Sequence, residues 1–302
     1  EISLGLVGSE MCIRDRRYIT CPNQTVSDSK NHHPGIDNRG PFLAMNPFSS
    51  RCCQHNHAQG WPYYAEHLIL ATPDNGVAAA MYAACKATVK VGDGNEISLH
   101  EQTNYPFEET IRFTVNTPKA VSFPFYLRIP SWTEGATIFV NGKKVAANPE
   151  AGQYACINRE WKDNDQVEIQ LPMQLSMCTW QVNKNSVSVD YGPLTMSLKI
   201  DEDYVKKDSR ATAIGDSKWQ EGADASQWPT YEIYAKTPWN YALVLGKNEP
   251  LKDFKVVHKE WPADNFPFTV ASTPIEVKAI GRKVPSWVIC LLYTSPSPRD
   301  RG

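Results

Sequence analysis

Apolar and polar residues alternate through most of residues 77–171, which is typical of strands with one buried face. Turn formers separate the runs, and Asn141-Gly142 favours a two-residue hairpin turn. Residues 77–84 are apolar almost throughout and predict a buried strand or a short helix. The alternation predicts strands at residues 87–91, 96–100, 110–115, 123–129, 137–140, 143–145, 153–158 and 166–171. Short strands at this regular spacing indicate an antiparallel β-sandwich.

A second group of short apolar runs predicts further strands near the C-terminal end, at residues 186–189, 194–198, 241–245, 254–257 and 275–279. The polar residues 201–229 interrupt this group. We therefore expect a mainly β protein with a second all-β region.

A helical period is visible just before the first strands, in Trp61, Tyr64, Ala65, Leu68 and Ile69. The spacing predicts a helix after Asn56 that ends at residues 72–76, with Pro62 near its first turn. We expect most of its aromatic side chains to pack in a core. Residues 17–50 are rich in turn formers and predict a long loop that leads to this helix.

The two ends of the chain can be encoded by the two strands of one DNA sequence. A string that encodes residues 6–16 has a reverse complement that encodes residues 290–299 in one frame. Unrelated protein termini would not share this property, and the string resembles a sequencing-library adapter. We therefore treat residues 1–16 and 290–302 as adapter-derived tails and exclude them from the expected fold. Residues 17–289 are then expected to be a fragment of a longer protein.

Composition and charge exclude some classes of partner. The 302 residues carry 31 Lys and Arg against 33 Asp and Glu, a net charge of −2. No basic patch of the kind that nucleic acid requires stands out, and no apolar run is long enough to cross a bilayer. We expect no nucleic-acid partner and no membrane partner. The length suits about two domains.

Cysteine usage points to free thiols rather than a disulfide scaffold, since six scattered cysteines remain between the tails. A reduced state slightly favours a cytoplasmic location, but without the natural N-terminus the localisation is unknown. Cys52 and Cys53 are adjacent, and adjacent cysteines rarely bond to each other because the ring is strained. Such a pair can be buried as two small apolar side chains, ligate zinc, or supply an activated nucleophile. The pair alone leaves these alternatives open.

The thiol pair begins a series of motifs that occur in the same order in one enzyme family. They are Arg51-Cys52-Cys53-Gln54-His55-Asn56, Trp61-Pro62-Tyr63-Tyr64-Ala65-Glu66, Ala71-Thr72-Pro73-Asp74-Asn75-Gly76, Asn104-Tyr105-Pro106-Phe107, Leu127-Arg128-Ile129-Pro130-Ser131-Trp132, Val140-Asn141-Gly142, Trp161-Lys162-Asp163-Asn164-Asp165, Leu171-Pro172-Met173 and Tyr191-Gly192-Pro193-Leu194. In this order they resemble the β-L-arabinofuranosidase-like family, glycoside hydrolase family 127. The resemblance implies that residues 17–74 are the last loop and helix of an α/α-barrel catalytic domain. Two antiparallel β-sandwich domains, residues 75–175 and 176–289, would follow.

The resemblance also implies a chemistry for the thiol pair. Cys52 would attack the anomeric carbon of a furanosidic sugar from a plant-type glycan, and the glycosidic bond would be hydrolysed with retention. Cys52 and Cys53 would ligate Zn²⁺ together with a Glu and a Cys that precede this fragment. We expect a carbohydrate substrate, and a homodimer through the β-sandwich domains is one assembly that this fold allows.

The sequence departs from the family pattern in two ways. Gln54 and His55 stand where the family has two prolines, which leaves the sugar specificity open. The upstream zinc ligands and the general acid precede the fragment, so we expect the fragment alone to be inactive. The paired carboxylates Glu108-Glu109 and Asp201-Glu202-Asp203 are expected to be solvated turns without a catalytic role.

Two readings besides the hydrolase stay open. The many Trp and Tyr residues suit a non-catalytic carbohydrate-binding β-sandwich protein, because aromatic rings stack on sugars. The thiol pair also suits a metal or redox site unrelated to sugars, in which His55 and His57 would complete a self-contained zinc site.

Overall fold

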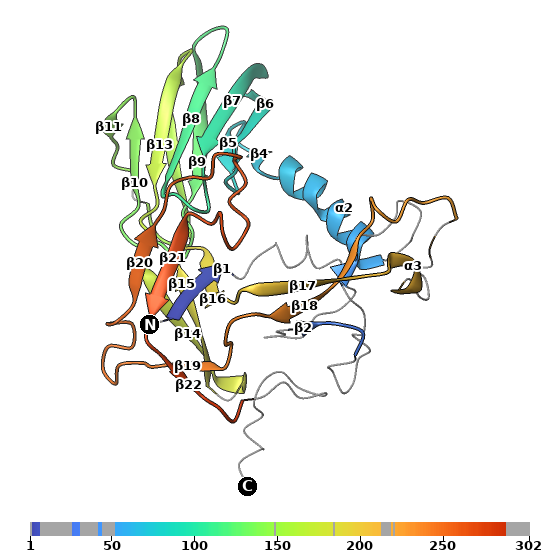
Figure 1. The fold of residues 1–302 in the computed structure, drawn as a ribbon. Coiled ribbons are helices and arrows are strands. Elements are labelled where there is room, and N and C mark those ends of the chain that lie inside the picture. Colours follow the sequence, from blue (N-terminus) through green and yellow to red (C-terminus); the bar gives the residue numbers. More distant parts are fainter. Residues whose placement is uncertain are drawn as a thin grey trace. The chain divides into compact units, whose positions relative to one another are not determined.

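Strands dominate the described part of the chain, which confirms that the protein is mainly β (Figure 1). The structure is a computed structural model, and it describes residues 2–6, 26–30, 42–43, 52–147, 149–183, 185–212, 219 and 221–287. The chain divides into two units, residues 61–195 and residues 1–60 with 196–302. No helix in the described ranges is long and apolar enough to span a membrane.

Residues 61–195 contain a six-stranded sheet in the order β11-β10-β13-β8-β7-β6. Every neighbouring pair in it is antiparallel. Its strands, in chain order, are β6 (Cys85–Val91), β7 (Asn95–Thr103), β8 (Thr110–Asn116), β10 (Thr137–Val140), β11 (Lys143–Lys144) and β13 (Asp165–Gln170). Asn141 and Gly142 join β10 to β11 with φ angles of 50° and 74°, so the predicted two-residue hairpin is confirmed.

A four-stranded sheet in the order β12-β9-β5-β4 lies opposite. Its strands are β4 (Ile69–Ala71), β5 (Val77–Ala79), β9 (Val121–Arg128) and β12 (Tyr154–Trp161). The expectation of a purely antiparallel sandwich is wrong at one place, because β5 pairs with β9 in parallel. The chain leaves β5, forms β6, β7 and β8 in the other sheet and then returns as β9, and such a long connection allows parallel pairing.

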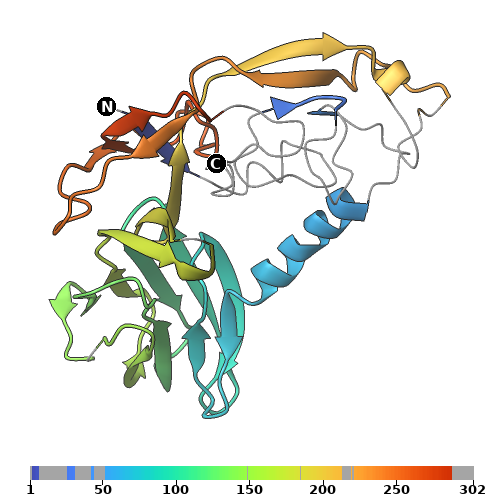
Figure 2. The same cartoon turned by 90° about the horizontal axis from the view of Figure 1, so that it is seen from below.

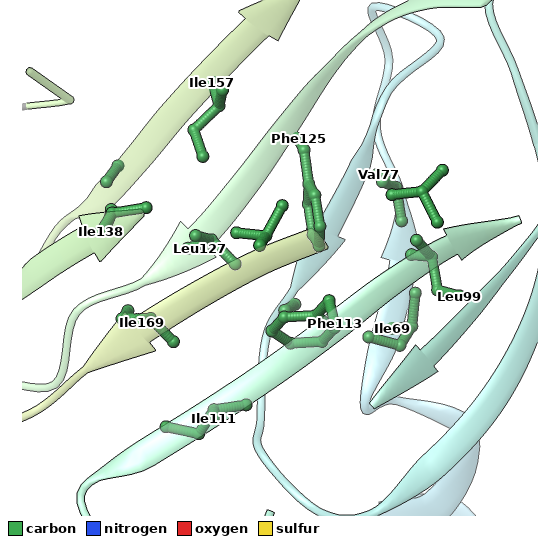
Figure 3. Close-up of a cluster of buried hydrophobic side chains, with 14 of the residues drawn as sticks. Ile69, Val77, Leu99, Ile111, Phe113, Phe125, Leu127, Ile138, Ile157 and Ile169 are labelled. Carbon is green, nitrogen blue, oxygen red and sulfur yellow. The ribbon is translucent and has the colours of Figure 1, made fainter. Parts of the chain in front are cut away.

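The two sheets enclose one apolar core (Figure 3). Phe113 of β8 and Phe125 of β9 are both fully buried, and their rings meet edge to face with centroids 5.3 Å apart. Trp161 of β12 is also fully buried, and its indole N–H donates to the carbonyl of Phe123 at 3.0 Å. Burying one such side chain contributes about 1.5–3 kcal/mol. A register slip by one residue would expose these rings, so the core fixes the phase of each strand.

The helix differs from its prediction in position and in burial. Helix α2 runs from Cys52 to Glu66, so it begins before Asn56 and ends before Leu68, and Pro62 lies in its second half rather than near its first turn. Trp61 and Tyr63 are 47% and 66% exposed, so the expected core packing is wrong for both side chains. Leu68 and Ile69 are buried as the chain leaves the helix and enters β4, which explains why they continue the helical spacing.

The hairpin β14 (Leu175–Trp180) and β15 (Ser186–Tyr191) ends the unit of residues 61–195, with a short 3-10 helix η1 (Gln181–Asn183) between its strands. Strand β15 confirms the prediction at residues 186–189, whereas β14 was not predicted. Figure 2 gives a second view of the strands.

The other unit holds the remaining strands. Strand β1 (Ile2–Leu6) pairs with β16 (Leu194–Leu198) and β21 (Ile275–Ala279), and β21 pairs with β20 (Lys255–His258). Strand β18 (Thr230–Ala235) pairs with β17 (Glu202–Lys207), β2 (Val26–Ser27) and β3 (Phe42–Leu43). Strands β19 (Tyr241–Leu243) and β22 (Gly281–Lys283) form a pair, and α3 (Ser209–Thr212) is a single helical turn.

Several of these strands lie where none was expected. Strand β17 falls inside the polar residues 201–229. It was not expected, because its side chains are almost all exposed and show no apolar alternation. Strands β2 and β3 fall inside the predicted loop of residues 17–50, of which little else is described. Strand β1 lies in the segment that we excluded as a tail. Strands β16 and β21 coincide with their predictions.

Candidate functional site

The thiol pair lies in the first turn of α2, since Cys52 and Cys53 are the first two residues of that helix. The first backbone N–H groups of a helix have no partner within it, and they give this end a partial positive charge. The side chains of residues 52–58 lie outside the described part of the structure, so no sulfur distance enters the argument.

The helix changes the geometry of the self-contained zinc alternative. Cys53 and His57 are four residues apart in α2, which is one helical turn. Among the side chains that the structure describes, no three His, Cys, Asp or Glu residues approach closely enough to hold a metal ion.

The Glu108 and Glu109 carboxylates each accept a hydrogen bond from a nearby loop. Glu109 accepts a hydrogen bond from the backbone N–H of Met173 at 2.7 Å, and Glu108 accepts one from the side-chain amide of Asn104 at 2.9 Å. Asp201 lies just before β17, where its backbone N–H donates to the Thr237 hydroxyl at 2.9 Å. Glu202 and Asp203 lie in strand β17, so the expectation of a turn is wrong for these two residues.

Glu101 is a buried carboxyl group that the sequence reasoning missed. It lies on β7 directly opposite Cys85 of β6, and it is only 1% exposed. Its carboxyl group accepts the backbone N–H of Ala83 at 3.0 Å and the Cys85 thiol at 3.6 Å. Burial raises the pKa of Glu101 to about 8, although both hydrogen bonds act to lower it. Burial also raises the pKa of the Cys85 thiol to about 11, so this thiol stays protonated at neutral pH and is a poor nucleophile.

A signal for Glu101 was present in the sequence. Ile97, Leu99 and Glu101 occupy alternate positions of β7, and the first two point into the core. The period-two rule therefore places the Glu101 side chain on the buried face as well.

The outer face of the six-stranded sheet carries a second polar cluster, in a shallow depression of about 340 Å³. Phe139, Glu168, Arg112 and Gln102 stand side by side across β10, β13, β8 and β7. Glu168 accepts the Nε–H of Arg112 at 2.8 Å and the side-chain amide of Gln170 at 2.9 Å. None of these residues was singled out from the sequence, because their proximity depends on cross-strand register.

The residues of the sandwich match a known family model. Residues 76–173 match the model described as the middle domain of β-L-arabinofuranosidase, GH127. This segment is therefore similar to a GH127 middle domain. The match confirms the resemblance drawn from the motifs and assigns the core of Figure 3 to that domain. A search of curated proteins gave no match.

Solved structures of glycoside hydrolases resemble the chain more distantly. A GH127 β-L-arabinofuranosidase from Geobacillus stearothermophilus T6 shares 21% identity and a TM-score of 0.45, over 61% of this chain and 34% of its own. A glycoside hydrolase shares 24% identity and a TM-score of 0.45, over 66% of this chain and 41% of its own. The GH127 β-arabinofuranosidase BT3674 shares 19% identity and a TM-score of 0.43, over 70% of this chain and 37% of its own. The chain spans about a third to two fifths of their length.

The raised pKa of Glu101 predicts how the stability of the middle domain depends on pH. Its pKa is raised from 4.5 to about 8, so the folded state keeps a proton that the unfolded state releases. The stability that this proton contributes is fully present below pH 4.5 and is lost as the pH rises through about 8, at up to about 1.4 kcal/mol per pH unit. We expect Glu101→Gln to remove this decline and to be more stable than the wild type at pH 8. Urea unfolding between pH 5 and pH 8 measures the slope.

The control for this experiment is Glu96→Gln, which changes an exposed carboxyl group on the same strand and should keep the wild-type slope. Equal slopes in the wild type and in Glu101→Gln would show that the buried carboxyl group does not govern the pH dependence.

Proposed function

We propose that the chain is part of a retaining glycoside hydrolase of the β-L-arabinofuranosidase-like family, with Cys52 as its nucleophile. The observation that carries the proposal is the GH127 middle domain at residues 76–173, which follows the thiol motif of residues 51–56 along the chain. The proposed substrates are non-reducing-end furanosidic sugars of plant-type glycans. The proposed assembly is a homodimer through the β-sandwich domains.

We propose that α2 is the last helix of an α/α-barrel catalytic domain. Its C-terminal half supports this assignment, because Trp61 and Tyr63 are large and yet about half or more exposed. Aromatic side chains with this exposure are a surface that packing against further helices would bury. The end of α2 is anchored to the middle domain, since the Tyr64 hydroxyl donates to the carbonyl of Tyr82 at 3.5 Å.

The proposed reaction has two displacements at the anomeric carbon. The Cys52 thiolate forms a bond to that carbon while the glycosidic C–O bond breaks, and the leaving oxygen takes a proton from a general acid outside this chain. Water then attacks the same carbon, the C–S bond breaks, and Cys52 returns as a thiolate. Two inversions give net retention. The position of Cys52 in the first turn of α2 favours the thiolate that both steps require.

Zn²⁺ is the proposed cofactor, with Cys52 and Cys53 as two of its ligands. Adjacent thiolates are soft donors that suit zinc, and bound zinc would keep the Cys52 sulfur deprotonated at neutral pH. Because the remaining ligands and the general acid are proposed to lie outside this chain, we propose that the chain alone does not turn over substrate.

The kinetic test uses the protein encoded by the complete gene and an activated β-L-arabinofuranoside. We expect Cys52→Ala to lower kcat by about 10⁴-fold or more, because the covalent route is lost. The matched control is Cys156→Ala, which removes an exposed thiol of the middle domain and should leave kcat unchanged. Proton NMR of the first-formed sugar should show retention. Full turnover by Cys52→Ala, or an inverted product, would contradict the proposal.

The zinc content of the same protein separates the proposed ligand set from the self-contained alternative. We expect about one zinc per chain in the wild type, a loss of zinc in Cys53→Ser, and wild-type zinc in His57→Ala, because a second thiolate is a ligand and the imidazole is not. Elemental analysis after gel filtration measures this ratio. Loss of zinc in His57→Ala, with zinc kept in the isolated 302-residue chain, would instead support the site within α2.

A further inference from the structure

We propose that the outer face of the six-stranded sheet binds a neutral saccharide, in the depression centred on Glu168. The site lies wholly within the GH127 middle domain, and it does not depend on the chemistry of Cys52.

The row across the strands has the dimensions and the groups of a sugar-binding surface. Phe139, Glu168, Arg112 and Gln102 are direct neighbours across four strands, so the row is about 14 Å long at ordinary strand spacing. This length exceeds one sugar ring. An aromatic ring at one end can stack on the C–H face of a sugar, while the other side chains can hydrogen-bond to its hydroxyl groups.

Hydrogen bonds between side chains hold Glu168 and Arg112 in place before any ligand arrives. Glu168 is only 28% exposed, and its two oxygens are used separately, Oε2 by Arg112 and Oε1 by Gln170. Gln170 in turn accepts the Thr137 hydroxyl at 3.3 Å. The Nε–H of Arg112 is therefore committed, and its terminal amino groups make no hydrogen bond to the described protein atoms. A preorganised donor loses less entropy on binding than a free side chain does.

The charge of the depression favours a neutral ligand. Among the described residues that line it, only Arg112 and Glu168 are charged, and they form an ion pair. The other polar lining side chains are neutral, namely Gln102, Thr114, Gln166 and Gln170. A uronic acid at the centre of the depression would meet the Glu168 carboxylate, because the next cation of the row, Lys144, stands beyond Phe139 on β11. Hydroxyl pairs of a neutral sugar can accept from the Arg112 amino groups and donate to the amide oxygens.

A cross-strand ion pair on a solvated surface accounts for only part of this arrangement. Such a pair contributes little to stability, and it needs neither the Gln170 and Thr137 contacts nor a half-buried Phe139 beside it. The volume of about 340 Å³ also lies at the lower end of the range for small-ligand sites.

The test is a ¹⁵N-NMR titration of the 302-residue chain with three probes, a linear arabinan oligosaccharide, a xylan oligosaccharide and an oligogalacturonate. We expect at least one neutral probe to bind more tightly than the oligogalacturonate and to shift the amides around Arg112 and Glu168. Phe139→Ala and Arg112→Ala should each weaken this binding about tenfold. Tyr154→Ala is the matched aromatic control, because Tyr154 is exposed on the other sheet and should leave binding unchanged.

Three outcomes would overturn the proposal. They are no binding of either neutral probe, equal binding by Phe139→Ala and wild type, and loss of binding in Tyr154→Ala alone. The competing occupant of this face is a second copy of the chain, and sedimentation of the same samples measures whether the chain forms a dimer. A dimer of the wild type that dissociates in Phe139→Ala would show that the face binds a second copy. Cys52→Ala should bind the probes as the wild type does, so failure of the proposed hydrolase activity does not affect this test.

Discussion

The edge-to-face packing of Phe113 on Phe125, with Trp161 beside them, is the constraint on which the middle domain depends. These rings come from both sheets, and each is fully buried. Because side chains alternate along a strand, burying them fixes which residues of β8, β9 and β12 point outward. The same packing that stabilises the core therefore places Arg112 and Tyr126 on opposite outer faces, and it turns Glu101 inward where its carboxyl group loses water.

The sequence was most informative where this alternation is clear. Residues 137–140, 194–198 and 275–279 were predicted to be strands and are strands with the same bounds, because turn formers or polar residues delimit each of them. Strand β17 was missed for the opposite reason. Its side chains are exposed along nearly its whole length, so backbone pairing with β18, rather than burial of one face, determines it.

The helix shows how an apolar period can mislead. Leu68 and Ile69 continue the spacing of Trp61 and Tyr64, but their burial comes from the turn into β4, after α2 has ended at Glu66. The beginning of α2 was missed because its first residues are poor helix formers such as Cys, His and Asn. Cys52 and Cys53 were found through the order of motifs, whereas the Glu168 cluster required the strand register, which one sequence does not give.

The proposed function requires that the Cys52 sulfur forms a covalent bond to the sugar. The most direct test is mass spectrometry of the complete-gene protein, quenched with acid during turnover of a slow arabinofuranoside and then digested. The account predicts a pentose adduct on the peptide that begins at Cys52, attached to that residue and absent in Cys52→Ala. An adduct on an Asp or Glu side chain, or turnover by Cys52→Ala at the wild-type rate, would contradict it.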